Sequence, residues 1–251
     1  MYAACKATVK VGDGNEISLH EQTNYPFEET IRFTVNTPKA VSFPFYLRIP
    51  SWTEGATIFV NGKKVAANPE AGQYACINRE WKDNDQVEIQ LPMQLSMRTW
   101  QVNKNSVSVD YGPLTMSLKI DEDYVKKDSR ATAIGDSKWQ EGADASQWPT
   151  YEIYAKTPWN YALVLGKNEP LKDFKVVHKE WPADNFPFTV ASTPIEVKAI
   201  GCKVPSWVID QYDLCSELPE MDAPKGEKEE ITLIPMGAAR LRVSAFPNTR
   251  E

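Results

Sequence analysis

The fold is decided by residues 47–65, which read LRIPSWTEGATIFVNGKKV. Apolar and polar residues alternate over Leu47–Ile49, and a proline then ends the run. A new apolar run begins at Ile58–Val60 and is followed at once by Asn61 and Gly62. An Asn-Gly pair next to such a run is a strong signal for a β-hairpin, because a type I′ turn needs a positive φ at both central residues. This stretch therefore predicts strands joined by tight turns.

The same alternation recurs through the first hundred residues. Residues two apart share one face of a strand, so each alternating run predicts a strand with one buried face. Clusters of Gly, Asn and Asp between the runs favour tight turns. Short strands at this spacing predict an all-β fold, a β-sandwich or jelly roll. The clearest runs are Ile31–Val35, Val41–Ile49 and Val87–Leu91, and the clearest turns are Gly12–Asn15 and Asp83–Asp85.

The pattern restarts near residue 100, which predicts two consecutive sandwiches, residues 1–100 and residues 101–251. Met93–Val102 reads as a crossing segment between them. A proline cannot donate a hydrogen bond to a sheet, so Gly112-Pro113 predicts a bulge or an edge position. Further strands are expected within residues 106–120, 159–165, 174–181, 195–204 and 230–246.

Two polar segments, residues 121–150 and 205–230, interrupt this pattern and are expected to be long loops. Long loops in a compact domain are often functional. Simple insertion at the surface is the commoner explanation, and the sequence leaves both open.

Composition excludes several classes of function. The 251 residues include 28 basic and 34 acidic side chains, giving a formal net charge of −6, and the two signs are interspersed. A nucleic-acid partner is not expected, because no basic stripe is present. No apolar run has the roughly 18 residues that a membrane span needs, so no membrane partner is expected either. The opening MYAACKATVK lacks the apolar core of a signal peptide, and the compartment stays open.

The sequence offers no catalytic or metal-binding motif. Its two histidines, His20 and His178, lie in predicted strands, and its four cysteines are far apart with no CxxC pair. Asp121–Asp123 could offer oxygen ligands to Ca²⁺ but lacks the spacing of a calcium loop, so a solvated acidic turn is favoured. We therefore predict no catalytic residue, no metal ligand and no cofactor in this chain.

The eight tryptophans are the better candidates for a binding role. An exposed indole ring stacks well on the C–H face of a sugar, so tryptophans outside strands suggest contact with carbohydrate. Burial in a core is the competing and more common explanation. The candidates are Trp139 and Trp148, favoured because they lie in the polar segment, followed by Trp52 and Trp159.

Taken together, six motifs give the chain a family resemblance. They are TNYPFEETIRFTV, FPFYLRIPSWTEGATIFVNGKKV, GQYACINREWKDNDQVEIQLPM, SVSVDYGPLTMSLKI, TPWNYALVL and ITLIPMGAARLRVSAFP. In this order, and over nearly the whole chain, they resemble the C-terminal β-sandwich region of the β-L-arabinofuranosidase-like glycoside hydrolases, the family 127 type. The resemblance implies a parent enzyme with a catalytic α/α barrel that acts on plant-type arabinose-containing glycans.

In that family a zinc-bound cysteine thiolate on the barrel is the nucleophile, so zinc is implied for the barrel only. The closely spaced cysteines of the barrel have no counterpart here, and no catalytic or metal residue is carried over. The resemblance thus implies a non-catalytic sandwich portion whose partner is the catalytic barrel, with glycan as a further partner. The alternative is an autonomous carbohydrate-binding module that uses exposed Trp and Tyr side chains.

Overall fold

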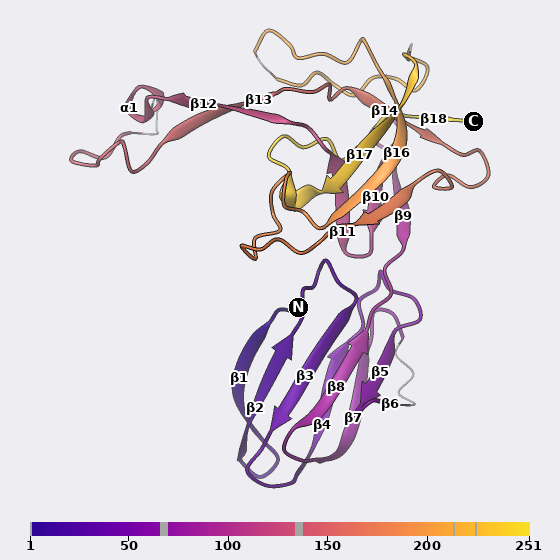
Figure 1. The fold of residues 1–251 in the computed structure, drawn as a ribbon. Helices are drawn as coiled ribbons and strands as arrows, with labels where there is room; N and C mark the ends of the chain where they lie inside the picture. Colours follow the sequence, from indigo (N-terminus) through magenta and orange to yellow (C-terminus); the bar gives the residue numbers. More distant parts are fainter. Residues whose placement is uncertain (1, 66–69, 134–137, 213, 224) are drawn as a thin grey trace. The chain divides into compact units, whose positions relative to one another are not determined.

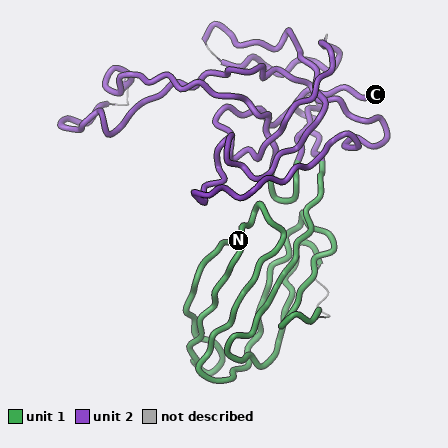
Figure 2. The backbone as a smooth tube through the Cα atoms, viewed as in Figure 1, with its two compact units in different colours: residues 1–96, 110–114 green, residues 97–109, 115–251 purple. Residues whose placement is uncertain are grey.

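The computed structural model describes residues 2–65, 70–133, 138–212, 214–223 and 225–251. The chain forms two compact units (Figure 2): residues 1–96 with 110–114, and residues 97–109 with 115–251. The expected fold class, all-β with two consecutive sandwich-like domains, is confirmed. The expected domain boundary at residue 100 stays a prediction. No helix in the described part of the chain has the length and apolar character that a membrane span requires.

The first unit is a sandwich of a six-stranded and a two-stranded sheet. The larger sheet has the order β1-β2-β3-β8-β5-β6, and β4 pairs with β7 in the smaller one. Figure 1 shows the smaller sheet behind the β8 and β5 end of the larger one. The strands are β1 (Cys5–Val11), β2 (Asn15–Gln22), β3 (Thr30–Asn36), β4 (Val41–Arg48), β5 (Thr57–Val60), β6 (Lys63–Lys64), β7 (Tyr74–Trp81) and β8 (Asp85–Gln90).

Alternating burial confirms the predicted one-sided strands. In β4 every second residue from Val41 to Leu47 is buried and the residues between are exposed. The inward residues of β3 and β8 are buried in the same way. Trp81 lies at the centre of this core without solvent exposure, with its ring centroid 5.7 Å from those of Phe43 and Phe45. Its indole Nε1–H donates to the Phe43 carbonyl at 2.9 Å, so the one polar group of the ring is satisfied.

The Asn61-Gly62 hairpin is confirmed. Asn61 has φ 50° and Gly62 has φ 76°, and they connect β5 to β6 with Val60 opposite Lys63. The Asn61 side chain also fixes the turn to β8, because its Oδ1 accepts from the Gln86 N–H at 2.8 Å. Its Nδ2 donates to Asp85 Oδ1 at 2.7 Å. The hairpin is therefore held by side-chain bonds as well as by backbone geometry.

Asp85 is a buried carboxylate at the junction of three elements. Besides Asn61, it accepts from the Lys82 N–H at 2.9 Å, and Arg79 Nη2 lies 3.5 Å from its Oδ2. Burial alone would raise the pKa of Asp85, but the hydrogen bonds from Asn61 and Lys82 outweigh it and the pKa is lowered. Asp85 is therefore charged at neutral pH and ties the β5–β6 hairpin to the β7–β8 turn.

The second unit is built on one long sheet. Its order is β18-β14-β16-β17-β11-β10-β9, and β15 pairs with β16. The strands are β9 (Leu95–Trp100), β10 (Ser106–Tyr111), β11 (Leu114–Leu118), β12 (Glu122–Lys127), β13 (Thr150–Ala155), β14 (Tyr161–Leu165), β15 (Lys175–His178), β16 (Ile195–Lys203), β17 (Lys228–Pro235) and β18 (Asn248–Arg250). The short helices of the described residues are α1 (Ser129–Thr132) and the 3-10 helix η1 (Met236–Ala238).

The prediction for Gly112-Pro113 is wrong. These residues do not interrupt a strand; they form the two-residue turn between β10 and β11, which are neighbours in the sheet. Gly112 has φ 54°, and a Cβ added there would lie 2.6 Å from Met93 Cγ, so the turn needs glycine. The expected crossing segment, residues 93–102, likewise contains the strand β9.

The expected loop at residues 121–150 is partly wrong as well. Its start forms β12, which pairs with β13 in a separate two-stranded ribbon. The other expected loop, residues 205–230, has little regular structure, but its Trp207 is buried and packs in a cluster with Ala162 and Cys202 of the main sheet. Within these two segments, residues 134–137, 213 and 224 lie outside the described part of the chain.

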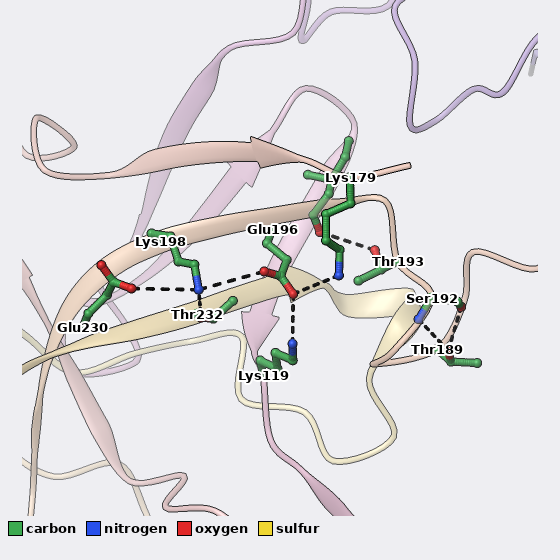
Figure 3. Close-up of polar contacts among 10 residues, drawn as sticks. Lys119, Lys179, Thr189, Ser192, Thr193, Glu196, Lys198, Glu230 and Thr232 are labelled. Carbon is green, nitrogen blue, oxygen red and sulfur yellow. Dashed lines mark hydrogen bonds and ion pairs between the residues drawn. The ribbon is translucent and has the colours of Figure 1, made fainter. Parts of the chain in front are cut away.

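A buried carboxylate also organises the second unit. Glu196 of β16 is nearly fully buried and lies among three lysines (Figure 3). Its Oε1 is 2.9 Å from Lys119 Nζ and 3.1 Å from Lys179 Nζ, and its Oε2 is 4.0 Å from Lys198 Nζ. Burial would raise the pKa of Glu196, but the hydrogen bonds from Lys119 and Lys179 outweigh it and the pKa is lowered. An ionised Glu196 thus connects the segments that carry these lysines.

Replacing Asp85 tests the first junction. In D85N an amide NH₂ group would face the Lys82 N–H and Arg79, so we expect a loss of about 1–3 kcal/mol in the free energy of unfolding at pH 7. Because the folded pKa is lowered, the difference from wild type should be complete above about pH 5 and shrink as pH falls below the ordinary value of about 3.9. Urea denaturation above about pH 5 and below about pH 3.9 measures this difference in the free energy of unfolding. D13N, in an exposed turn, is the control, and equal effects of the two substitutions would contradict this role.

Replacing Glu196 tests the role of the buried carboxylate in the second unit. E196Q leaves the three lysines without the carboxylate that they share, and we expect a loss of about 1–3 kcal/mol at pH 7. The pH dependence has the same direction as for D85N, because a carboxylate with a lowered pKa in the folded state contributes stability that is lost as the pH falls. The matched control is E230Q, because Glu230 also lies near Lys198, at 3.9 Å, but is exposed. A destabilisation by E230Q as large as that by E196Q would show that burial of Glu196 is unimportant.

Candidate functional site

The structure separates the four tryptophans that the sequence singled out. Trp52, half-buried, packs against the core of the first unit. Trp139 is half-buried, and its Nε1–H donates to the Ala143 carbonyl at 3.3 Å. Trp148 is 68% exposed, and Trp159 is half-buried beside Trp207. Trp159 lines a groove, and contact with carbohydrate stays a prediction for all four.

The β12–β13 ribbon forms an arm that extends from the main sheet of the second unit, with α1 near its tip (Figure 1). We call residues 122–155 the arm. Its strands are exposed on both faces, and their aromatic side chains are about half exposed: Tyr124, Tyr151 and Tyr154. The rings of Tyr124 and Tyr151 meet edge to face with centroids 6.1 Å apart.

The base of the arm is fixed to the chain near residue 240. Glu122 Oε1 accepts from the Arg240 N–H at 2.8 Å, and Glu122 Oε2 accepts from the Tyr124 hydroxyl at 2.6 Å. Just after β13, the Lys156 N–H donates to the carbonyl of Asp121, which precedes β12, at 2.7 Å. Glu122 therefore anchors the base of the arm to the second unit.

A groove of about 1060 Å³ lies at this base. It is formed by four segments far apart in the sequence, all within the second unit. They are the end of β13 with the residues that follow it, the residue Ile120 after β11, the pair Ile209 and Cys215, and residues 241–243. This volume is slightly above the range of about 300–1,000 Å³ that is usual for ligand sites. We call it the arm-base groove.

The aromatic wall of the arm-base groove is rigid. The rings of Trp159 and Trp207 meet edge to face at 72° with centroids 5.0 Å apart. Trp207 is buried, and its Nε1–H donates to the Ser216 carbonyl at 3.2 Å. Next to Trp159, Asn160 Nδ2 donates to the carbonyls of Val204 and Trp207, each at 3.1 Å. Trp159 is thus held between fixed neighbours.

Polar groups line the same groove. Arg242 Nε donates to the Ala239 carbonyl at 2.9 Å, which fixes the plane of the guanidinium. Lys156 Nζ lies 3.4 Å from Asp123 Oδ1. Hydrogen bonds from the Tyr154 hydroxyl and Lys127 hold the pKa of Glu152 below its ordinary value, so Glu152 is an acceptor at neutral pH. The groove combines an apolar wall with donors and an acceptor.

The residues present do not fit a zinc site. Among the described residues, no three His, Cys, Asp or Glu side chains come together in a group that could hold a metal ion. Cys202 is buried, burial raises the pKa of its thiol, and its Sγ lies 3.8 Å from the Ala162 carbonyl. We therefore derive no chemical step through a metal.

Sequence reasoning missed most of the arm-base groove. Arg242 and Lys156 gave no signal, because their partners come from other segments of the chain. The exposed tyrosines of the arm were hidden in a segment that was expected to be a loop. The one available signal was Trp159, which follows a proline at the start of a predicted strand.

Comparison with known proteins points to one family. Residues 1–93 match the family model of the "Beta-L-arabinofuranosidase, GH127 middle domain". No curated protein matches the chain.

Three solved structures share the fold over nearly the whole chain. A glycoside hydrolase matches 100% of it with a TM-score of 0.61 and 22% identity. A GH127 β-L-arabinofuranosidase from Geobacillus stearothermophilus T6 matches 99% with the same TM-score and identity. A GH127 β-arabinofuranosidase matches 99%, with a TM-score of 0.60 and 20% identity.

The chain spans only about a third of these proteins, 35%, 33% and 34% of their lengths. At this level of identity the structures establish the fold, and the family model adds the relationship in sequence over residues 1–93. The resemblance to the β-sandwich region of the family 127 β-L-arabinofuranosidase-like hydrolases is thereby confirmed.

Proposed function

We propose that this chain is a non-catalytic β-sandwich portion of a glycoside hydrolase of the β-L-arabinofuranosidase type, acting on plant-type arabinose-containing glycans. One observation carries the proposal. Residues 1–93 match the middle domain of that family, while the whole chain corresponds in fold to only about a third of the solved hydrolases. In this proposal the bond-breaking groups belong to the catalytic barrel of the parent enzyme, which is the partner of this chain.

The protonation of the acidic side chains favours a non-catalytic role for this chain. A glycosidase commonly needs a carboxylic acid with a raised pKa beside a second carboxylate. Burial raises the pKa of Glu21, whose oxygens accept from the Ala3 N–H and the Cys5 thiol. Asp85, Glu152 and Glu196 instead have lowered pKa values and are engaged by cationic or amide donors. Carboxylates in this condition accept hydrogen bonds and do not deliver a proton at neutral pH.

The edge of the first sandwich supports a partner for residues 1–100. All residues of β1 from Cys5 to Lys10 are exposed, on both faces of the strand. Ala7 and Val9 lie opposite Leu19 and Ile17 of β2, so they share the core-side face of the sheet. Apolar side chains on an uncovered inner face are typical of a surface that another domain covers. We propose that the catalytic barrel is that domain.

An activity assay tests the proposal. The purified chain should release no p-nitrophenol from p-nitrophenyl β-L-arabinofuranoside, because the groups that cleave the bond are placed on the barrel. The Geobacillus hydrolase, assayed at equal molar concentration, is the positive control. Turnover that stays with the chain through successive purification steps and chelation of metals would contradict the proposal.

The parent gene provides the complementary test. Read in full, it should also encode a helical barrel with closely spaced cysteines. A gene that encodes sandwich domains alone would contradict the proposed hydrolase and favour an autonomous carbohydrate-binding module.

A further inference from the structure

We propose that the arm-base groove binds an oligosaccharide, with Trp159 as the surface on which one sugar ring stacks and with Arg242 and Lys156 as donors to its hydroxyl groups. The inference deepens the proposed function and rests on it only for the choice of the first sugar to test.

The size of the groove favours a chain of sugars. Its volume of about 1060 Å³ exceeds what one pentose or hexose ring would fill, and it is open to solvent. A closed apolar pocket of this size would suit a lipid. An open groove instead leaves room for a chain of sugars to extend beyond the residues that line it.

The chemistry of the lining matches the two-sided character of a sugar ring. A sugar presents C–H groups on its faces and hydroxyl groups around its edge, so it needs an apolar surface with polar groups at the margin. In the groove, Trp159, Pro158 and Leu241 supply apolar surface. Arg242 and Lys156 supply N–H donors, and Glu152 supplies an ionised acceptor. Both signs of charge are present, which does not favour a strongly acidic or strongly basic ligand.

The rigidity of the groove lowers the cost of binding. Trp159 is fixed by its edge-to-face contact with the buried Trp207, and the backbone beside it is fixed by the Asn160 amide. The Arg242 guanidinium is oriented by its bond to the Ala239 carbonyl. Side chains that are already ordered lose little entropy when a ligand binds, so weak sugar contacts can sum to measurable affinity.

Calorimetry with three soluble probes tests the inference: oligosaccharides of L-arabinose, of D-xylose and of D-glucose, each titrated into the full 251-residue chain. We expect saturable binding of at least one probe. W159A should weaken it by about tenfold or more, as for a central aromatic contact, and R242Q by about fivefold, as for one hydrogen bond.

The matched control is W148A, since Trp148 is exposed and does not line the groove. We expect it to bind like the unaltered chain. Circular dichroism should be recorded for each variant. If W159A loses its fold, R242Q decides the matter, because Arg242 is exposed and its replacement leaves the core intact.

The outcomes separate this inference from the proposed function. No binding of any probe by the unaltered chain overturns the groove and leaves the activity and gene tests unaffected. Binding that is lost in W148A but kept in W159A also overturns it and assigns the sugar to the arm. Binding of xylose or glucose chains alone, lost in W159A, supports the groove and contradicts the arabinose part of the proposed function.

Discussion

The first sandwich depends on keeping one buried charge satisfied. Asp85 is almost inaccessible to water, and an unpartnered carboxylate in such a place would cost several kcal/mol of stability. Its oxygens therefore require the Asn61 amide and the Lys82 N–H at fixed positions. Those two groups lie in the β5–β6 hairpin and the β7–β8 turn, so one carboxylate fixes the geometry of both connections. The apolar core supplies most of the stability, and Asp85 helps to select one register for the strands around it.

The main sheet of the second unit also contains a buried carboxylate with several partners, and the arm is held in a different way. Glu196 connects Lys119, Lys179 and Lys198 around a buried point. The strands β12 and β13 of the arm instead form a two-stranded ribbon with exposed faces, held by surface pairs such as Lys127–Glu152. An isolated ribbon of two strands is marginally stable in water, so its anchorage through Glu122 fixes its position at the base. The arm-base groove lies where this anchorage and the rigid pair Trp159–Trp207 meet.

How much the sequence could predict follows from how local each signal is. The strands β3, β4 and β8 alternate apolar and polar residues because one face is buried, and the Asn61-Gly62 turn is encoded in two adjacent residues. β12 was missed because both of its faces are exposed, so no alternation marks it. Gly112-Pro113 was misjudged because a turn and a bulge use the same residue types. The groove could not be predicted from the sequence, because Trp159 and Arg242 are far apart in the chain. Only the folding of the strands between them brings both into one site.

The strand β1 has a consequence for how the molecule behaves in concentrated solution. It is the outermost strand of its sheet, and seven residues without proline offer backbone groups along that margin to any other strand of suitable length. Lys6 and Lys10 stand on its outward face. When two molecules approach through this margin, four ammonium groups are brought together, and their mutual repulsion opposes the growth of intermolecular sheets. These two lysines therefore act as built-in protection against aggregation through this edge strand.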